Sequence, residues 1–278
     1  MSTRNTVRIA WLAVGGTLTA LAVAFTTLAA LAEINAPDRM VETTSRFHTL
    51  TSPKVVVRAT GHVDLTVVTG REKRLDVERE LLWTRHRPVA TERWDGRTLT
   101  VDAHCPGDPG GPGGPDGPDG PDGPDGPECR AQYVLTLPAA TGVEASIRSG
   151  TLSVNGVHGD LRLSADTGDV IVMDSLGTLR ARVRRGNVFG LDLRSAGADV
   201  ETGRGHVSLG FTNPPGDVRA VVRSAGDVEV RVPDEGDGSG YDVRTASGDA
   251  TVAVRIDPDA PRRITALTPA GELHVLPS

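Results

Sequence analysis

The sequence lacks the motifs that mark the common enzyme classes. It has no H-E-x-x-H metalloprotease motif, no G-x-S-x-G nucleophile elbow, no Walker loop and no dinucleotide-binding fingerprint. Polysaccharide cleavage would need two converging acids, but the acidic residues recur along the chain and the 7 histidines are scattered. We therefore predict a non-enzymatic protein with no catalytic residues and no cofactor.

A net positive charge is also missing. The formal charge is −6 at pH 7 in a chain of 278 residues. A protein of this balance does not, as a whole, attract a nucleic acid. Nucleic acid is therefore not expected among its partners.

Cysteine is scarce, with Cys105 and Cys129 as the only two. In an oxidising compartment such a pair predicts a disulfide. A metal site is the alternative, but the pair lacks a C-x-x-C pattern and only His104 lies beside it. We expect the disulfide and no metal site.

The N-terminus carries one long apolar segment. Arg4 and Arg8 precede Ile9–Ala32, which is uncharged and long enough to span a bilayer core of about 30 Å. The positive residues predict a cytoplasmic tail over 1–8, a transmembrane anchor over 9–32, a polar spacer over 33–46 and an extracytoplasmic domain over 47–278. The alternative is a cleaved signal peptide, since Ala30-Leu31-Ala32 resembles a cleavage site, although the apolar run exceeds the usual length of about 7–15 residues. The domain is exported either way, as a single-pass membrane protein or in secreted form.

From Gly150 onward the chain repeats itself. Glycines recur every nine residues at first and then less regularly, and a short alternating strand follows each of them. The glycines are Gly150, Gly159, Gly168, Gly177, Gly186, Gly205, Gly216, Gly226, Gly248 and Gly271. A fixed period of this kind indicates a repeat architecture.

The physics of one unit predicts the fold. Glycine marks the corner, and the next strand places residues such as Leu161 and Leu163 on one face and Arg162 on the other. Two units make a rung in which each strand pairs with the strand two units on, so we predict an all-β, right-handed β-solenoid. An antiparallel meander would use the same residues and stays open.

The first half of the domain is less regular. Strands are expected at Lys54–Ala59, Val63–Val68, Leu75–Leu82, Thr98–Ala103 and Tyr133–Leu137, and Trp83–Trp94 is expected to be a longer connection in which Pro88 argues against a central strand. Residues 106–128 are predicted to be a disordered Gly/Pro/Asp insert, held at its base by the disulfide. The alternative for its four aspartates is a weak cation site, although their spacing is not that of an EF-hand.

Gly-Asp pairs such as Gly168-Asp169 also invite a calcium-roll interpretation. Calcium rolls, however, cluster their glycines, and an aspartate after a corner glycine more often accepts hydrogen bonds from the backbone of its own turn. We expect this local role.

One stretch is locally basic. Alternation places Arg180, Arg182 and Arg184 on one outward face, where they would contact anionic envelope polymers. The alternative is a solvated face balanced by nearby acids such as Asp199 and Glu201.

An ordered series of short strings carries a family resemblance. The strings are Tyr133–Pro138 (YVLTLP), Ile147–Val154 (IRSGTLSV), Ala165–Val172 (ADTGDVIV) and Thr245–Val252 (TASGDATV). Together they resemble the "putative-adhesin" β-strand-repeat family of bacterial envelope proteins. The resemblance implies a right-handed β-helix-like fold, no known catalysis, and a surface or envelope role. It supplies no functional residues.

These observations predict a membrane-anchored, adhesin-like protein that binds or presents a surface at the cell envelope. Its expected partners are cell-wall or surface polymers. The alternative is an accessory sensor or regulator of envelope-stress signalling, with a membrane signalling protein as partner.

Overall fold

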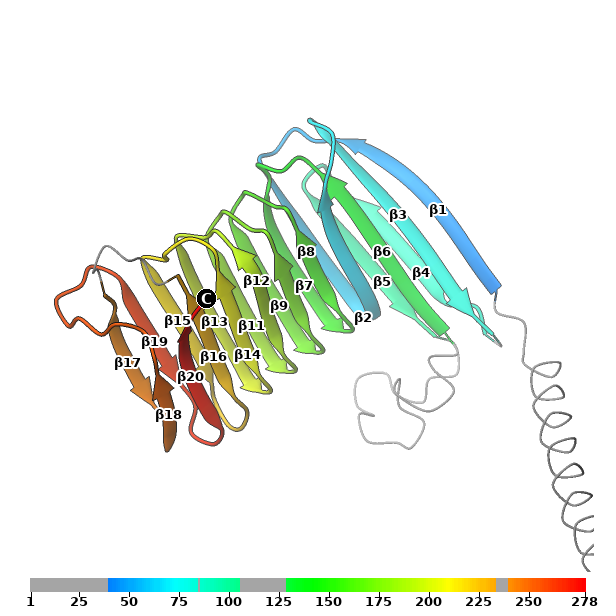
Figure 1. Ribbon diagram of the computed structural model, residues 1–278. Helices are drawn as coiled ribbons and strands as arrows, with labels where there is room; N and C mark the ends of the chain where they lie inside the picture. The colour runs from blue at the N-terminus through cyan, green and yellow to red at the C-terminus, as the bar shows by residue number, and fades with distance from the viewer. Residues whose placement is uncertain (1–39, 85, 106–128, 234–239) are drawn as a thin grey trace, which may run out of the picture. The chain divides into compact units, whose positions relative to one another are not determined.

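The computed structural model describes residues 40–84, 86–105, 129–233 and 240–278. In these residues the chain is all-β, with twenty strands and no helix (Figure 1). None of the described segments is therefore a helix of the length and apolarity that crossing a membrane requires. The predicted anchor over 9–32 and the predicted insert over 106–128 lie outside the described residues.

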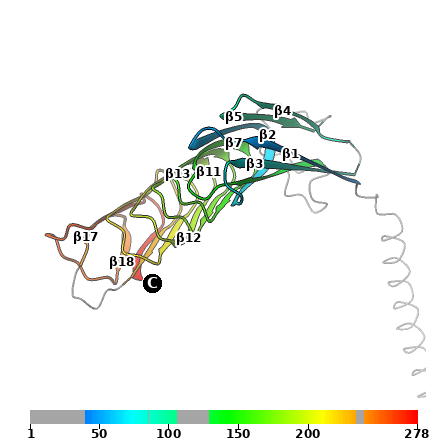
Figure 2. The same ribbon diagram turned by 90° about the horizontal axis from the view of Figure 1, so that it is seen from above.

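Residues 142–232 form five successive rungs. Each rung has one strand in each of two facing sheets, called sheet B and sheet A. The sheet B strands are β7 (Gly142–Ser149), β9 (Leu161–Thr167), β11 (Leu179–Arg185), β13 (Gly197–Arg204) and β15 (Asp217–Val222). The sheet A strands are β8 (Leu152–Asn155), β10 (Val170–Met173), β12 (Val188–Leu193), β14 (Val207–Phe211) and β16 (Val228–Val232). Figure 2 separates the two layers, with β7, β11 and β13 along one side and β12 along the other.

Every pairing between these rungs is parallel. Leu161 of β9, for example, lies in register with Val143 of β7 and with Leu179 of β11. Each strand thus pairs with the strand two units on, as the period predicts, and the antiparallel meander is excluded for the repeats.

At the N-terminal end the chain order and the spatial order differ. Strand β2 (Lys54–Thr69) bends at Gly61 and runs through both sheets, between the rung of β7 and β8 and a rung made of β5 (Thr98–His104) and β6 (Cys129–Leu137). Three antiparallel strands complete this end: β1 (Met40–Thr49) and β3 (Arg74–Trp83) extend sheet A, and β4 (Val89–Trp94) extends sheet B.

The C-terminal end repeats this inversion. The last rung, β19 (Arg263–Leu267) with β20 (Glu272–Pro277), lies between the rung of β15 and β16 and the rung of β17 (Asp242–Ala246) with β18 (Asp249–Val252). The chain therefore passes to the end of the stack and returns to fill the position before it.

Stacked glycines form the corner between the two sheets along one side, which we call the glycine edge. Its members are Gly61, Gly150, Gly168, Gly186, Gly205, Gly226 and Gly271, all of which have positive φ. At Gly186 a Cβ would lie 2.0 Å from the carbonyl oxygen of Gly168, closer than any side chain permits. Glycine is required here both by the backbone angle and by the approach of the neighbouring rung.

Aliphatic side chains fill the space between the sheets. In sheet A the row Leu152, Val170, Val188, Val207, Val228 and Leu273 is fully buried and in register. Each such side chain contributes about 1.5–3 kcal/mol by leaving water. Because this core lies within Met40–Ser278, which is a compact unit of its own, that segment can be studied separately.

Two boundaries differ from the predictions. Strand β1 begins at Met40, so residues 40–46 belong to the folded unit and not to the predicted spacer. Residues 89–94 form β4, not part of a long connection, although β4 is an edge strand, which agrees with Pro88 just before it.

Candidate ligand-binding face

The outward surface of sheet B collects the charged residues of the repeats. On β7, β9 and β11 the inward positions are buried and apolar, while the outward positions carry Glu144, Ser146, Arg148, Arg162, Ser164, Asp166, Arg180, Arg182 and Arg184. We call this surface of the three strands the arginine face. Since the strands pair in parallel register, the outward side chains form rows across the rungs.

The three predicted arginines lie together on β11 and are exposed. Their surroundings differ. Arg182 binds Asp199 through its guanidinium and also donates to the Asp199 carbonyl oxygen at 2.8 Å. Arg184 lies 3.8 Å from a carboxylate oxygen of Asp166, and Arg180 forms no ion pair with any residue that the structure describes.

Carboxylates on β13 hold a network of arginines. Arg223 binds Glu201 with two parallel hydrogen bonds of 2.7 and 2.9 Å, and Arg219 bridges Glu201 and Asp199 at 3.4 and 3.3 Å. The bonds from Arg223 lower the pKa of Glu201. Partial burial by itself would raise the pKa of Asp199. The hydrogen bonds from Arg182 and Arg219 outweigh this effect, so the pKa of Asp199 is lowered overall. Both groups are therefore ionised and fully engaged at neutral pH.

On the other side of the face, Glu144 is engaged by a lysine. Lys54 Nζ lies 2.5 Å from Glu144 Oε2, and this hydrogen bond lowers the pKa of Glu144. The carboxylates at both ends of the row that contains Arg162 and Arg180 are therefore already paired.

Arg162 was missed by the sequence reasoning. It lies in register with Arg180 on the neighbouring strand and, like Arg58 and Arg148, it forms no ion pair with a described residue. The signal that would have found it is the length of a rung, because Arg162 stands eighteen residues before Arg180.

Small side chains leave two shallow hollows on this face. The larger hollow has a volume of about 530 Å³. Its polar lining is Thr60, Ser146, Arg148, Ser164, Asp166, Arg182, Arg184 and Glu201, and its apolar lining is Ala59, Ile147, Ala165 and Val183. The smaller, about 330 Å³, is lined by Glu144, Arg162, Leu163, Ser164, Arg180 and Arg182. Ser164 and Arg182 border both hollows.

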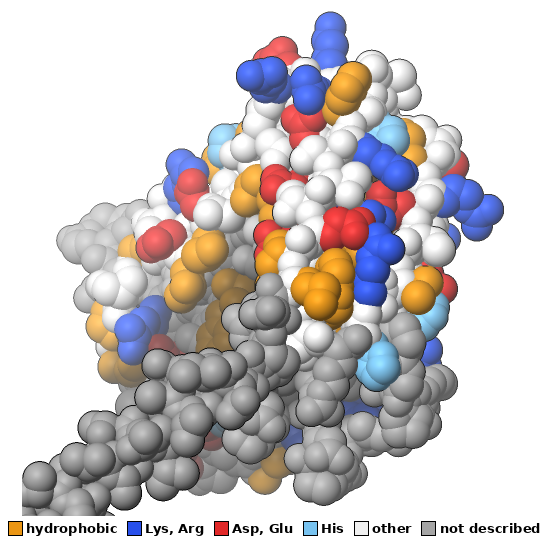
Figure 3. Space-filling view, turned by 90° about the vertical axis from the view of Figure 1, so that its right-hand side faces the viewer, with side chains coloured by type: hydrophobic (Ala, Val, Ile, Leu, Met, Phe, Trp, Pro, Cys, Tyr) orange, Lys and Arg blue, Asp and Glu red, His pale blue; other side chains and the backbone are white. Residues whose placement is uncertain are grey.

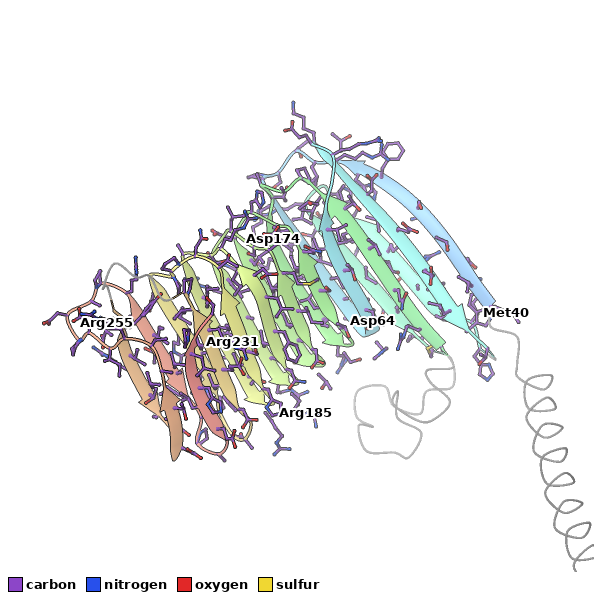
Figure 4. The ribbon with its side chains drawn as sticks, viewed as in Figure 1. Met40, Asp64, Asp174, Arg185, Arg231 and Arg255 are labelled. Carbon is purple, nitrogen blue, oxygen red and sulfur yellow. A yellow bond between two sulfur atoms is a disulfide. The ribbon has the colours of Figure 1, made fainter. Side chains whose placement is uncertain are left out.

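Three aspartates that directly follow repeat glycines, Asp160, Asp169 and Asp227, accept hydrogen bonds from another rung and not from their own turns. Asp169 Oδ1 accepts hydrogen bonds from the Asn187 backbone N–H at 2.8 Å and from its side-chain amide at 3.0 Å, one rung on. Asp64 similarly accepts from Thr151 N–H at 2.9 Å. The expected local role is thus wrong in its partners, since these carboxylates connect successive rungs. Figure 4 places Asp64 and Arg185 at the glycine edge and Asp174 at the opposite edge.

The side chains that could ligate a metal ion are dispersed over the described residues. In the described part of the chain, no three His, Cys, Asp or Glu side chains are grouped to hold a metal ion. One carboxylate oxygen of each of Asp64, Asp160, Asp169 and Asp227 accepts a hydrogen bond from a backbone N–H of the neighbouring rung.

The disulfide predicted between Cys105 and Cys129 is present, with a Cα–Cα distance of 6.0 Å. It connects the end of β5 to the start of β6, at the glycine edge. The pair closes the corner that a single glycine closes in the neighbouring rungs.

A buried polar cluster closes the interior at the N-terminal end. Arg79 of sheet A pairs with Glu92 of sheet B at 3.0 Å, and the Tyr133 hydroxyl donates to Glu92 at 3.3 Å. The Glu92 side chain is only 8% exposed. Figure 3 shows this end from outside, where basic, acidic and hydrophobic side chains are mixed.

Comparison with known proteins leaves the family unassigned. No family model and no curated protein matches the chain. Three solved structures do, each at 10% identity over 85% of this chain. They are a "putative cell adhesion protein" of Clostridium sporogenes (TM-score 0.37, 100% of that chain), a "putative adhesin" of Bacteroides fragilis (0.34, 97%) and a "putative adhesin" of Parabacteroides distasonis (0.27, 97%). A likeness this distant carries no argument about function, and the family resemblance stays a prediction.

Proposed function

We propose that this chain is a non-enzymatic, adhesin-like protein of the cell envelope that binds an anionic surface polymer through its arginine face. In this proposal the stack is a right-handed β-solenoid, held at the membrane by the predicted segment 9–32 or released after cleavage. Arg180, Arg182 and Arg184 contribute to the ligand face.

One observation carries the proposal. On a chain of net charge −6, the two hollows of the arginine face are lined by five arginines and only three carboxylates, an excess of two positive charges. Parallel strands about 4.8 Å apart hold these groups on a rigid lattice, which suits a polymer with regularly spaced charges. The disulfide agrees with an oxidising, exported location.

The test is co-sedimentation of residues 40–278 with cell-wall sacculi, with and without their anionic polymers. We expect saturable binding that disappears when the polymers are removed and that weakens as salt screens the charges. A triple variant with Arg180, Arg182 and Arg184 changed to Gln should bind at least about tenfold more weakly.

The matched control changes Arg71, Arg231 and Arg255 to Gln, three exposed arginines that do not line the arginine face. This control removes the same charge and should bind about as well as the unmodified protein. Absence of binding to sacculi of either kind would contradict the proposal and direct the search to a membrane-protein partner.

A further inference from the structure

We infer that Arg162 and Arg180 form a subsite for a phosphodiester group, with the Ser164 hydroxyl beside them. The inference rests on the proposed function, because it names the chemical group that the arginine face recognises in a polymer. The subsite lies in the smaller hollow, across β9 and β11.

Two like charges lie side by side in the smaller hollow. Arg162 and Arg180 occupy facing positions of adjacent parallel strands, which lie about 4.8 Å apart. Like charges side by side in a sheet destabilise it. A bound anion would neutralise the pair and remove this cost.

The neighbouring carboxylates are bound elsewhere. Hydrogen bonds from Thr178, and then the charges of Arg162 and Arg180, lower the pKa of Asp160, but its Oδ1 accepts from Thr178 and it lies within ion-pair distance of neither arginine. Glu144 flanks Arg162 in register but binds Lys54 at 2.5 Å. Asp199 flanks Arg180 in register but binds Arg182 and Arg219. The two central guanidinium groups are thus left with exposed donors and no carboxylate within ion-pair distance among the described residues.

The geometry favours a phosphodiester over a carboxylate. A carboxylate has two oxygen atoms in one plane, which a single arginine satisfies with two parallel hydrogen bonds. A phosphodiester carries its charge on two non-bridging oxygen atoms that diverge from a tetrahedral phosphorus and can accept from two guanidinium groups on different strands and from a hydroxyl. The Ser164 hydroxyl donates only a long hydrogen bond of 3.4 Å to the Ala145 carbonyl, so it can turn toward a ligand.

The experiment measures binding of residues 40–278 to an oligomer of glycerol phosphate and to an oligogalacturonate of equal charge. The variant R162Q/R180Q removes the subsite. The matched control R58Q/R204Q also removes two exposed arginines without a described ion pair, one on β2 and one on β13, and neither lines a hollow. Thermal unfolding verifies that both variants are folded.

We expect the phosphodiester oligomer to bind saturably, R162Q/R180Q to weaken it at least about tenfold, and R58Q/R204Q to weaken it less than about twofold. Oligogalacturonate should bind more weakly. Equal losses in the two variants, or equal binding of the carboxylate oligomer, would overturn the subsite. Binding to sacculi without binding to the phosphodiester oligomer would overturn the subsite and leave the proposed function intact. Failure to bind either one would refute both.

Discussion

Gly168 lies so close to Gly150 in the preceding rung that a Cβ on Gly168 would be 1.8 Å from the Gly150 carbonyl oxygen. The same approach recurs along the glycine edge. The spacing that the hydrogen bonds between parallel strands impose therefore leaves no room for a Cβ at these corners, and the glycine period of the sequence is a packing requirement as well as a turn signal.

Replacing Gly168 by Ala tests this relationship. The backbone at Gly168 has φ of +124°, a region that is strained for any residue with a side chain, and the methyl group would also overlap the Gly150 carbonyl. We expect a loss of more than about 2 kcal/mol in the free energy of unfolding, measured with urea. Gly248→Ala is the control, because a Cβ there meets nothing within 4 Å. Equal stability of the two variants would contradict the argument.

The disulfide should stabilise the N-terminal end. Cys105 and Cys129 are separated by 24 positions, and removing a cross-link of this length typically costs about 2–4 kcal/mol. We expect the double variant C105A/C129A to lose stability in this range. Reduction of the unmodified protein should cause a similar loss, whereas the double variant should not respond to reductant.

Tyr133 should make the protein less stable at alkaline pH. Burial raises its pKa, and the negative charge of Glu92 raises it further. In the unfolded protein a tyrosine loses its proton at about pH 10. The folded protein retains this proton, so the folded state binds more protons above that pH. The stabilisation from protonated Tyr133 should therefore be fully present below about pH 10. The free energy of unfolding should fall as pH rises above that value, by up to about 1.4 kcal/mol per pH unit. Urea unfolding between pH 8 and 11 measures this slope. It should be shallower in Tyr133→Phe, and an unchanged slope would refute the assignment.

Substitution of two arginines of β11 should affect the stability of the protein and its polymer binding differently. Arg182 is held by Asp199, so Arg182→Gln should lower the free energy of unfolding by up to about 1 kcal/mol and weaken polymer binding less than Arg180→Gln does. Arg180 has no such partner among the described residues, so Arg180→Gln should weaken polymer binding several-fold without lowering stability. Paired thermal unfolding and sacculus binding on the two variants measure both quantities. The reverse assignment of effects would contradict the geometry.

The sequence predicts the repeats well because their information is local. The glycine at each corner and the alternation after it, as in Leu161-Arg162-Leu163, determine where a strand begins and which face is buried. The placement of β19 and β20 before β17 and β18 depends on which edges pair over long separations, and local spacing does not encode it. The same limit applies to the antiparallel strands β1, β3 and β4.

The candidate site, too, is predicted only in part by local sequence, because the rest depends on which strands pair. Alternation along β11 places Arg180, Arg182 and Arg184 outward, as the structure has them. Their difference in pairing depends on β13 and β9, where Asp199 and Arg162 stand in register beside them. Local alternation alone therefore selects the strand but not the residue that is available to a ligand.

The inverted order of the terminal rungs restricts how a protein of this kind can change its length in evolution. Because β20 is already flanked by β16 and β18, a further rung could not pair with it, and would have to pair with β17 and β18, which each pair with one strand among the described residues. Gain or loss of whole repeats disturbs no crossover only in the interior, from β9 to β14, where every rung has the same neighbours in sequence as in space. Variation in the length of the arginine face would therefore arise by gain or loss of interior rungs, with the crossovers of β2 and of β19 and β20 retained.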